Sequence, residues 1–215
     1  MKGDIVNVEQ HHRRAARTIV DRLEAEIRAH SRPYTITVAG ESGSGKSETG
    51  KAIDEECSAR GLEAYVFQQD DYFRLPPKSN DRKRREDIAW VGVGEVRLDL
   101  LDEHLAAARE RSSSVVKPLV DYDADSIGEE TADLSGIDVA IAEGTYTTLL
   151  HNVDCRVFIA RTRVDTLESR KQRAREHIEP FLEHVLEIEH GIIAPHREKA
   201  DVIISNDYEV SFVDR

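Results

Sequence analysis

A glycine-rich segment of eight residues constrains this chain more than any other feature. Residues 40–47 read Gly-Glu-Ser-Gly-Ser-Gly-Lys-Ser, which is the G-x-x-x-x-G-K-S spacing of a phosphate-binding loop. A chain of this length would show the pattern by chance on the order of one time in a hundred. An apolar, β-rich segment (34–39) precedes the loop, and a segment typical of a helix (48–57) follows it. The loop therefore lies in the strand–turn–helix context that phosphate binding requires.

The residue types of the loop explain its chemistry. Glycines let the backbone come close to an anion because no Cβ intervenes. The N–H groups of the loop and of the following helix then point at phosphate oxygens. We expect Lys46 to reach the β- and γ-phosphates and the Ser47 hydroxyl to ligate Mg²⁺. The predicted nucleotide-binding residues are Gly40, Ser42, Gly43, Ser44, Gly45, Lys46 and Ser47.

Composition narrows the class of protein. The 215 residues suffice for one α/β domain with a sizeable core, and the formal charge of −12 argues against nucleic acid as a partner. No apolar run approaches the roughly 20 residues of a membrane span. Two cysteines, Cys57 and Cys155, suggest a reducing compartment rather than a disulfide scaffold. We expect a soluble cytoplasmic protein without a membrane partner, and homo-oligomer formation stays open.

Predicted strands and helices alternate along the chain. The periodicity predicts helices at 8–30, 95–109 and 180–191 and strands at 64–68, 114–120, 137–142 and 155–160, whereas 74–87 reads as a polar loop. Alternation of this kind favours a mainly parallel central sheet covered by helices on both faces. The predicted fold is a three-layer α/β sandwich around the phosphate loop.

Acidic residues follow two of these strands. Asp70 and Asp71 come after the strand 64–68, and Glu143 comes after the strand 137–142. Strand ends beside a phosphate loop face the ligand crevice, where a carboxylate can accept a proton from an attacking hydroxyl or hold Mg²⁺. The alternative is that the two aspartates only open a turn. The repetition of the pattern at Glu143 favours the functional interpretation.

These motifs together resemble the uridine kinase and phosphoribulokinase family of phosphate-loop kinases. Uridine kinases carry a Q-D-S-F-Y element and nicotinamide riboside kinases a Q-D-D-F-F element, to which residues 69–73, Q-D-D-Y-F, are similar. Residues 170–173 match an R-x-x-R of the family's lid helix, and residues 200–204 match its closing A-D-V-I-I strand. The resemblance spans roughly residues 34–206. It implies one phosphate-loop kinase domain over 1–215, with an N-terminal helix (1–32), a substrate-side segment (74–97) and a helical lid region (164–190).

The resemblance also implies roles for individual residues. Asp70 corresponds to the general base toward the substrate hydroxyl, and it should be the aspartate aimed into the crevice because successive side chains leaving a strand point to opposite faces. The candidate Mg²⁺ ligands are Ser47, Glu143 and Asp70. The charge on the transferring group would be stabilised by Lys46, Arg170 and Arg173. The expected activity is transfer of the γ-phosphoryl group of ATP, with Mg²⁺, to a hydroxyl of a small metabolite.

The residues expected to contact the acceptor come from several segments. They are Asp71, Tyr72, Arg82, Trp90, Arg97, Tyr122 and Glu143. Alternatives stay open for some of them, because Trp90 also suits a core or hinge position, Arg97 a surface salt bridge, and the basic run 78–85 a solvated loop.

The base-reading residues of uridine kinases are missing. Ala124 and Ile127 lie near where that family places an aromatic residue and a histidine, and no N-F-D-H-P element occurs near Trp90. Uridine and cytidine should therefore be poor acceptors.

Two other functions compete with a kinase. One is a regulatory ATPase or nucleotide switch without an acceptor. Residues 133–136, Asp-Leu-Ser-Gly, fit the D-x-x-G of GTPase switches, but a plain turn accounts for them better. No guanine-reading N-K-x-D motif occurs after them. The other is a binding protein that has lost catalysis, against which Lys46, Asp70 and Glu143 all argue. A solvated basic face stays open as the alternative for the lid helix, and the family's R-G-R is absent at residues 175–177.

Overall fold

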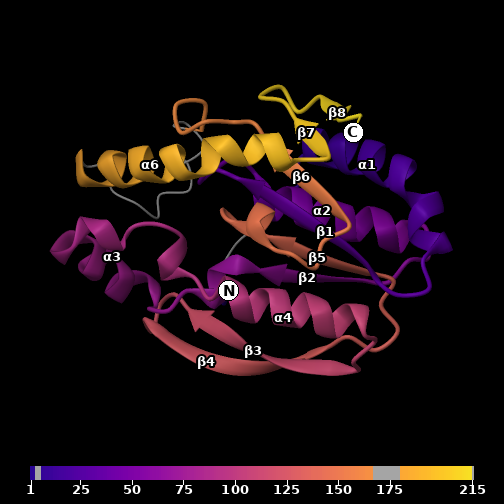
Figure 1. Cartoon of the computed structure of the whole chain (residues 1–215), viewed down its shortest axis with the longest axis horizontal. Coiled ribbons are helices and arrows are strands. Elements are labelled where there is room, and N and C mark those ends of the chain that lie inside the picture. Colours follow the sequence, from indigo (N-terminus) through magenta and orange to yellow (C-terminus); the bar gives the residue numbers. More distant parts are fainter. Residues whose placement is uncertain (3–5, 167–179, 215) are drawn as a thin grey trace.

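The computed structural model describes residues 1–2, 6–166 and 180–214, and Figure 1 shows its central sheet between helices. The six strands lie in the order β2-β5-β1-β6-β7-β8, and every neighbouring pair is parallel except β7–β8. The bounds are β1 Tyr34–Gly40, β2 Ala64–Gln68, β5 Val139–Glu143, β6 Cys155–Ile159, β7 Val202–Ile204 and β8 Val210–Phe212. The mainly parallel sheet is confirmed.

Alternating side chains of the strands build a core on each face of the sheet. Ile36 and Val38 of β1 pack in one cluster with α1 (Gln10–Ala29) and α2 (Lys46–Ala59). Ala39, the next residue of the same strand, packs in the other cluster with α4 (Leu98–Arg109). In α1 the buried residues Ala15, Ile19, Leu23 and Ile27 recur every four positions, as the sequence predicts. The helices on both faces confirm the three-layer arrangement.

Two segments form elements that the sequence does not predict. Residues 74–87 are not a loop, because α3 (Pro77–Glu86) forms there with a proline in its first turn, where a missing N–H costs nothing. Its one buried residue is Asn80, so no apolar stripe marks it. Likewise β4 (Ser126–Asp133), which pairs antiparallel with β3 (Ser114–Asp121) as a separate two-stranded sheet beside α4, is mostly exposed and lacks the alternation of a buried strand (Figure 1).

Short 3₁₀ turns and one further helix complete the described chain. The helix expected over 95–109 begins only at Leu98, because the chain before it forms η3. None of the helices in the described ranges is long and apolar enough to cross a membrane. The remaining bounds are η1 Gln69–Tyr72, η2 Ile88–Trp90, η3 Val93–Glu95, η4 Thr147–Leu149, α6 Pro180–Ile193 and η5 Ala194–Lys199.

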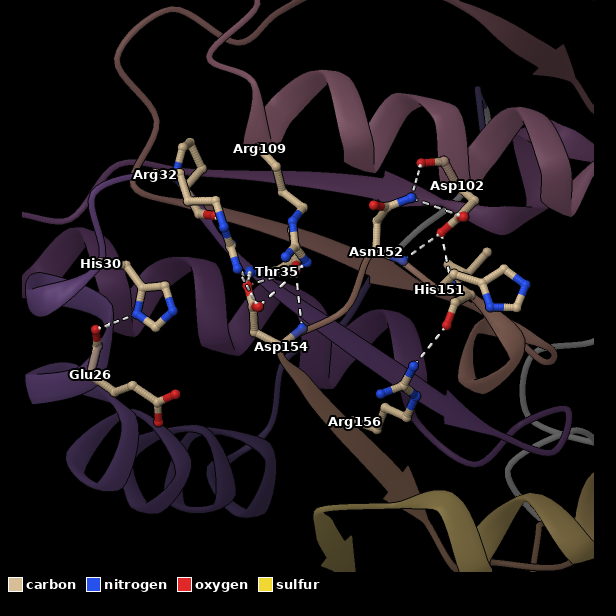
Figure 2. A network of polar contacts seen from close by, with 12 residues as sticks. Glu26, His30, Arg32, Thr35, Asp102, Arg109, His151, Asn152, Asp154 and Arg156 are labelled. Carbon is tan, nitrogen blue, oxygen red and sulfur yellow. Dashed lines mark hydrogen bonds and ion pairs between the residues drawn. The ribbon is translucent and has the colours of Figure 1, made fainter.

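A polar network lies at the amino end of β1, opposite the end that leads into the phosphate loop. Figure 2 shows Asp154 between Arg32 and Thr35, at the amino end of β1. Its carboxylate accepts two hydrogen bonds of 2.7 Å from the Arg32 guanidinium and one of 2.9 Å from the Thr35 N–H. Burial acts to raise the pKa of Asp154, but the hydrogen bonds from Arg32 and Thr35 outweigh it and hold the pKa at about 2. The network clamps the first strand to the chain entering β6.

Candidate active site

The phosphate loop follows β1 and leads directly into α2. Gly45, the residue before the helix, has φ 97°, a left-handed conformation, and a Cβ at this position would lie 2.0 Å from the Tyr208 hydroxyl oxygen. Only glycine meets both conditions. The Ser44 N–H donates to the Glu41 carbonyl oxygen at 3.1 Å and closes the turn. The first N–H groups of α2 are thereby presented at the carboxyl edge of the sheet, as an anion site requires.

The Lys46 and Ser47 side chains lie at the start of α2. The Lys46 ammonium donates to the carbonyl oxygen of Glu41 at 3.0 Å. The Ser47 hydroxyl donates to Oε1 of Glu143, the last residue of β5, also at 3.0 Å. The hydroxyl and carboxylate oxygens that the sequence suggested for Mg²⁺ are therefore adjacent, and hard oxygen ligands of this kind suit that ion.

Asp70 and Asp71 take opposite orientations at the end of β2. The strands β2 and β5 are neighbours, with Gln68 in register with Glu143, so η1 starts beside the Ser47–Glu143 pair. Asp70 is exposed, whereas Asp71 is only 1% exposed. Asp70 thus points away from the core, and its assignment as the aspartate aimed into the crevice stays a prediction.

Gln69 holds this turn in place, and the sequence interpretation assigned it no role. Its side-chain oxygen accepts a hydrogen bond of 2.7 Å from the Tyr146 N–H, which ties η1 to the chain after β5. A Cβ on Gly144 would lie 2.2 Å from the Gln69 Cβ, so the glycine of the E-G pair makes room for this contact. The only indication of this role in the sequence is that the glutamine belongs to the Q-D-D element.

Asp71 and Tyr72 have partners in the interior, and their role as acceptor contacts stays a prediction. The Asp71 carboxylate accepts hydrogen bonds from Lys117 Nζ at 2.7 Å and from the Val120 N–H at 3.0 Å. The Tyr72 hydroxyl is bonded to His104 Nδ1 at 2.8 Å, and burial raises its pKa. These contacts fasten η1 to β3 and to α4. Adjacency to Asp70 in sequence could not reveal that both side chains face the core.

Lys117 is a buried cation, only 3% exposed. Burial acts to lower its pKa, but the hydrogen bonds to Asp71 and to Glu130 outweigh that effect and raise the pKa. The Lys117 Nζ to Glu130 Oε1 distance is 2.6 Å. The ammonium thus stays charged between one carboxylate from η1 and one from β4.

The basic run 78–85 is held by partners within the protein. Arg84 pairs with Glu95 at 2.6 Å and with Glu189 at 3.0 Å, so it joins α3 to η3 and to α6. Burial acts to lower the pKa of Arg84, but the charges of Glu189 and Glu95 outweigh it and raise the pKa. Arg82 is exposed and donates to Ser79 Oγ at 2.6 Å. This run is a helix with ion-paired side chains rather than the solvated loop that the sequence suggested.

Three further candidates from the sequence lie around this segment. The half-buried Trp90 donates its ring N–H to Asn80 Oδ1 at 2.9 Å, which anchors η2 to α3. Arg97 lines a pocket of about 530 Å³ between α4 and the β3–β4 hairpin, and its Nε finds no hydrogen-bond partner among the described residues. Tyr122 follows β3, with Lys78 Nζ 6.0 Å from its ring centroid.

The lid arginines expected from the sequence, Arg170 and Arg173, lie outside the described residues, as does Arg175. Within the described ranges, no three His, Cys, Asp or Glu side chains gather in a way that could hold a metal ion. The candidate Mg²⁺ ligands therefore stay Ser47, Glu143 and Asp70, together with the oxygens of the nucleotide itself.

Comparison with known proteins agrees with this geometry. A glycine-rich loop after a parallel strand, whose serine is bonded to a carboxylate at the end of a neighbouring strand, is the geometry of phosphate-loop nucleotide-binding proteins. The family model of the Phosphoribulokinase / Uridine kinase family matches residues 35–208, and the chain belongs to this family. It is thus a small-molecule kinase that acts on a hydroxyl group, and the family implies ATP as the phosphoryl donor. The resemblance stated from the sequence is confirmed.

Individual relatives differ in what they phosphorylate. The chain is 31% identical over 189 residues to the bifunctional alpha-galactosidase/sucrose kinase AgaSK of Mediterraneibacter gnavus, covering 81% of this chain but only 20% of that protein. It is 29% identical to the uridine kinase of Bacillus pumilus, covering 81% of this chain and 87% of the relative. The solved D-glycerate 3-kinase of Cryptococcus neoformans has a TM-score of 0.63 at 16% identity, over 95% of this chain and all of that one, and shows the shared fold.

Proposed function

We propose that this kinase uses Mg·ATP and phosphorylates a hydroxyl of a carbohydrate or related polyol rather than uridine or cytidine. The observation that carries the catalytic part is the 3.0 Å contact between Ser47 and Glu143, beside the exposed Asp70. Loop, metal ligands and candidate base thus share one edge of the sheet. The proposal assigns no role to nucleic acid, since the chain carries a formal charge of −12.

Each of these groups has one task in the proposal. The N–H groups at the start of α2 and the Lys46 ammonium hold the phosphates. Ser47 and Glu143 would hold Mg²⁺, which when bound would neutralise phosphate charge. Asp70 orients the acceptor hydroxyl and takes its proton as the oxygen attacks. Arg170 and Arg173 stay predicted contributors from the lid region.

Two observations support a carbohydrate acceptor. The relative with 31% identity contains a sucrose kinase, and the matched region covers 81% of this chain. The residues near which uridine kinases read the pyrimidine are here Ala124 and Ile127, neither of which can hydrogen-bond a base through its side chain. The turn at Ala124 is instead tied to α3, because Asp125 accepts from the Lys78 N–H at 2.7 Å and from Ser79 Oγ at 2.8 Å. Sugar hydroxyls need no base-reading ring.

An acceptor panel tests the proposal. ADP release is measured with ATP and Mg²⁺ alone and then with sucrose, hexoses, glycerol, glycerate, uridine and cytidine, with Asp70→Asn as the control for catalysis. We expect turnover that requires an added sugar or polyol and that is lost in Asp70→Asn. Turnover independent of any acceptor would instead indicate a regulatory ATPase, and uridine as the preferred acceptor would refute the carbohydrate assignment.

A further inference from the structure

Glu41, the first variable residue of the phosphate loop, is buried and bonded to two distant segments. It is 6% exposed. Its Oε1 lies 2.6 Å from Nδ1 of His190 on α6, and its Oε2 accepts the Arg163 N–H at 2.6 Å. Residue 163 follows β6, so one carboxylate joins the loop to two elements 122 and 149 residues away. Phosphate binding through loop N–H groups does not by itself require a side chain at this position.

The backbone of the same residue faces the catalytic end of the loop. Its carbonyl oxygen accepts the Ser44 N–H at 3.1 Å and the Lys46 ammonium at 3.0 Å. The position of the Glu41 peptide therefore sets both the closure of the turn and the place where the lysine rests. The surrounding loop is rich in glycine and has little intrinsic stiffness, so bonds from outside the loop can determine its conformation. We call the two bonds of the Glu41 carboxylate, to His190 and to the Arg163 N–H, the Glu41 tie.

The two elements bonded by Glu41 are also bonded to each other. The Arg163 guanidinium lies 3.3 Å from the Glu183 carboxylate and 3.9 Å from that of Glu187, both on α6. Glu41, Arg163 and α6 thus form a closed triangle of contacts with one corner in the phosphate loop. A shift of α6 or of residue 163 must move Glu41 or break one of these bonds.

We propose that Glu41 is a positioning residue of the kinase: its carboxylate fixes the phosphate loop against α6 and residue 163, and so places the Lys46 ammonium for the incoming phosphates. When a nucleotide binds, Lys46 exchanges the Glu41 carbonyl for phosphate oxygens, and the tie keeps the loop closed during that exchange. Loss of the tie weakens nucleotide binding without removing any group that touches the nucleotide. The inference rests on the proposed function only in that the loop holds ATP.

Substitutions separate this role from a merely structural one. In Glu41→Ala both side-chain bonds disappear, and we expect ADP affinity to fall and KM for ATP to rise by about 10- to 100-fold. Glu41→Gln keeps an oxygen for the Arg163 N–H and an amide for His190, so it should stay within about threefold of wild type. His190→Ala removes one bond and should cost about tenfold. His184→Ala, exposed on the same helix, is the matched control and should change affinity by less than about twofold.

The experiment measures the ADP dissociation constant by calorimetry, KM and kcat for ATP, and the melting temperature of each variant. The double variant Glu41→Ala/His190→Ala should be no weaker in ADP binding than Glu41→Ala, because in this proposal His190 acts on the loop only through Glu41. Glu41→Ala with a lowered melting temperature but unchanged ADP affinity would overturn the positioning role. So would equal behaviour of His190→Ala and His184→Ala. Wild-type protein that binds no ADP would instead overturn the proposed function itself.

Discussion

Asp71→Asn should mainly destabilise the fold, whereas the neighbouring Asp70→Asn should mainly slow the chemistry. Asp71 is 1% exposed, and its ion pair with Lys117 is buried on both sides. Removal of one partner of such a pair costs about 3–5 kcal/mol. Glu130 still pairs with Lys117, and an asparagine oxygen can still accept from Val120, so we expect about 3 kcal/mol. For a chain of this size that is a drop in Tm of about 6–12 °C.

The comparison uses two adjacent substitutions of identical chemistry. Both variants are melted with circular dichroism detection, titrated with ADP, and assayed for kcat with the best acceptor of the panel. Asp70 is exposed, so Asp70→Asn should keep the wild-type Tm within about 2 °C. Its kcat should fall by about 10²- to 10⁴-fold while ADP still binds, because a general base contributes about that much.

Three results would contradict this reasoning. A wild-type Tm for Asp71→Asn would mean that the buried pair does not stabilise the fold. A large loss of kcat in Asp71→Asn with little change in Asp70→Asn would mean that Asp71, not Asp70, is the catalytic carboxylate. Loss of nucleotide affinity in Asp70→Asn would assign this residue chiefly to Mg²⁺ rather than to the acceptor proton.

Three further predictions address the loop, the acceptor and acid stability. Lys46→Ala should abolish phosphoryl transfer at an unchanged Tm, and full turnover in the variant would exclude the loop as the ATP site. For uridine and cytidine, kcat/KM should stay below about 10⁴ M⁻¹s⁻¹, and a higher value would refute the assignment drawn from Ala124 and Ile127. Asp154 has a folded pKa of about 2, below its ordinary 3.8, so its contribution of about 2 kcal/mol is present above pH 4 and lost as pH falls toward 2. Acid titration of stability should show this slope in wild type, and Asp154→Asn should lack it and be less stable at pH 7.

The sequence predicted those parts of the fold that local patterns encode. The buried strands and α1 carry apolar residues at the period of their structure, and the phosphate loop is specified by eight contiguous residues. The helix α3 and the strand β4 escaped prediction because their side chains are polar on nearly every face. Such segments are stabilised by ion pairs with residues distant in sequence, and these cannot be predicted from a local pattern of residue types.

In the candidate site, too, the features that follow from local sequence could be predicted and those that depend on distant residues could not. The exposure of Asp70 and the Ser47–Glu143 contact agree with what strand ends beside a loop predict. The interior contacts of Asp71 and Tyr72 involve residues more than 30 positions away, so their neighbours in sequence gave no indication of them. The bonds of Glu41 likewise depend on distant residues.

The acceptor side of this kinase should consequently vary independently of the ATP side. In our proposal ATP is held by the phosphate loop, whereas α3, η2 and η3 form the predicted substrate-side segment and are held to one another by Arg84, Asn80 and Glu95. Arg84→Ala would leave the Glu95 and Glu189 carboxylates without their shared cation, so α3 should shift against α6. We expect KM for the acceptor to rise by about tenfold or more, while the ADP dissociation constant stays within about twofold. A parallel loss of ADP affinity would show that α6 transmits the change to the phosphate loop, through the contact between His190 and Glu41.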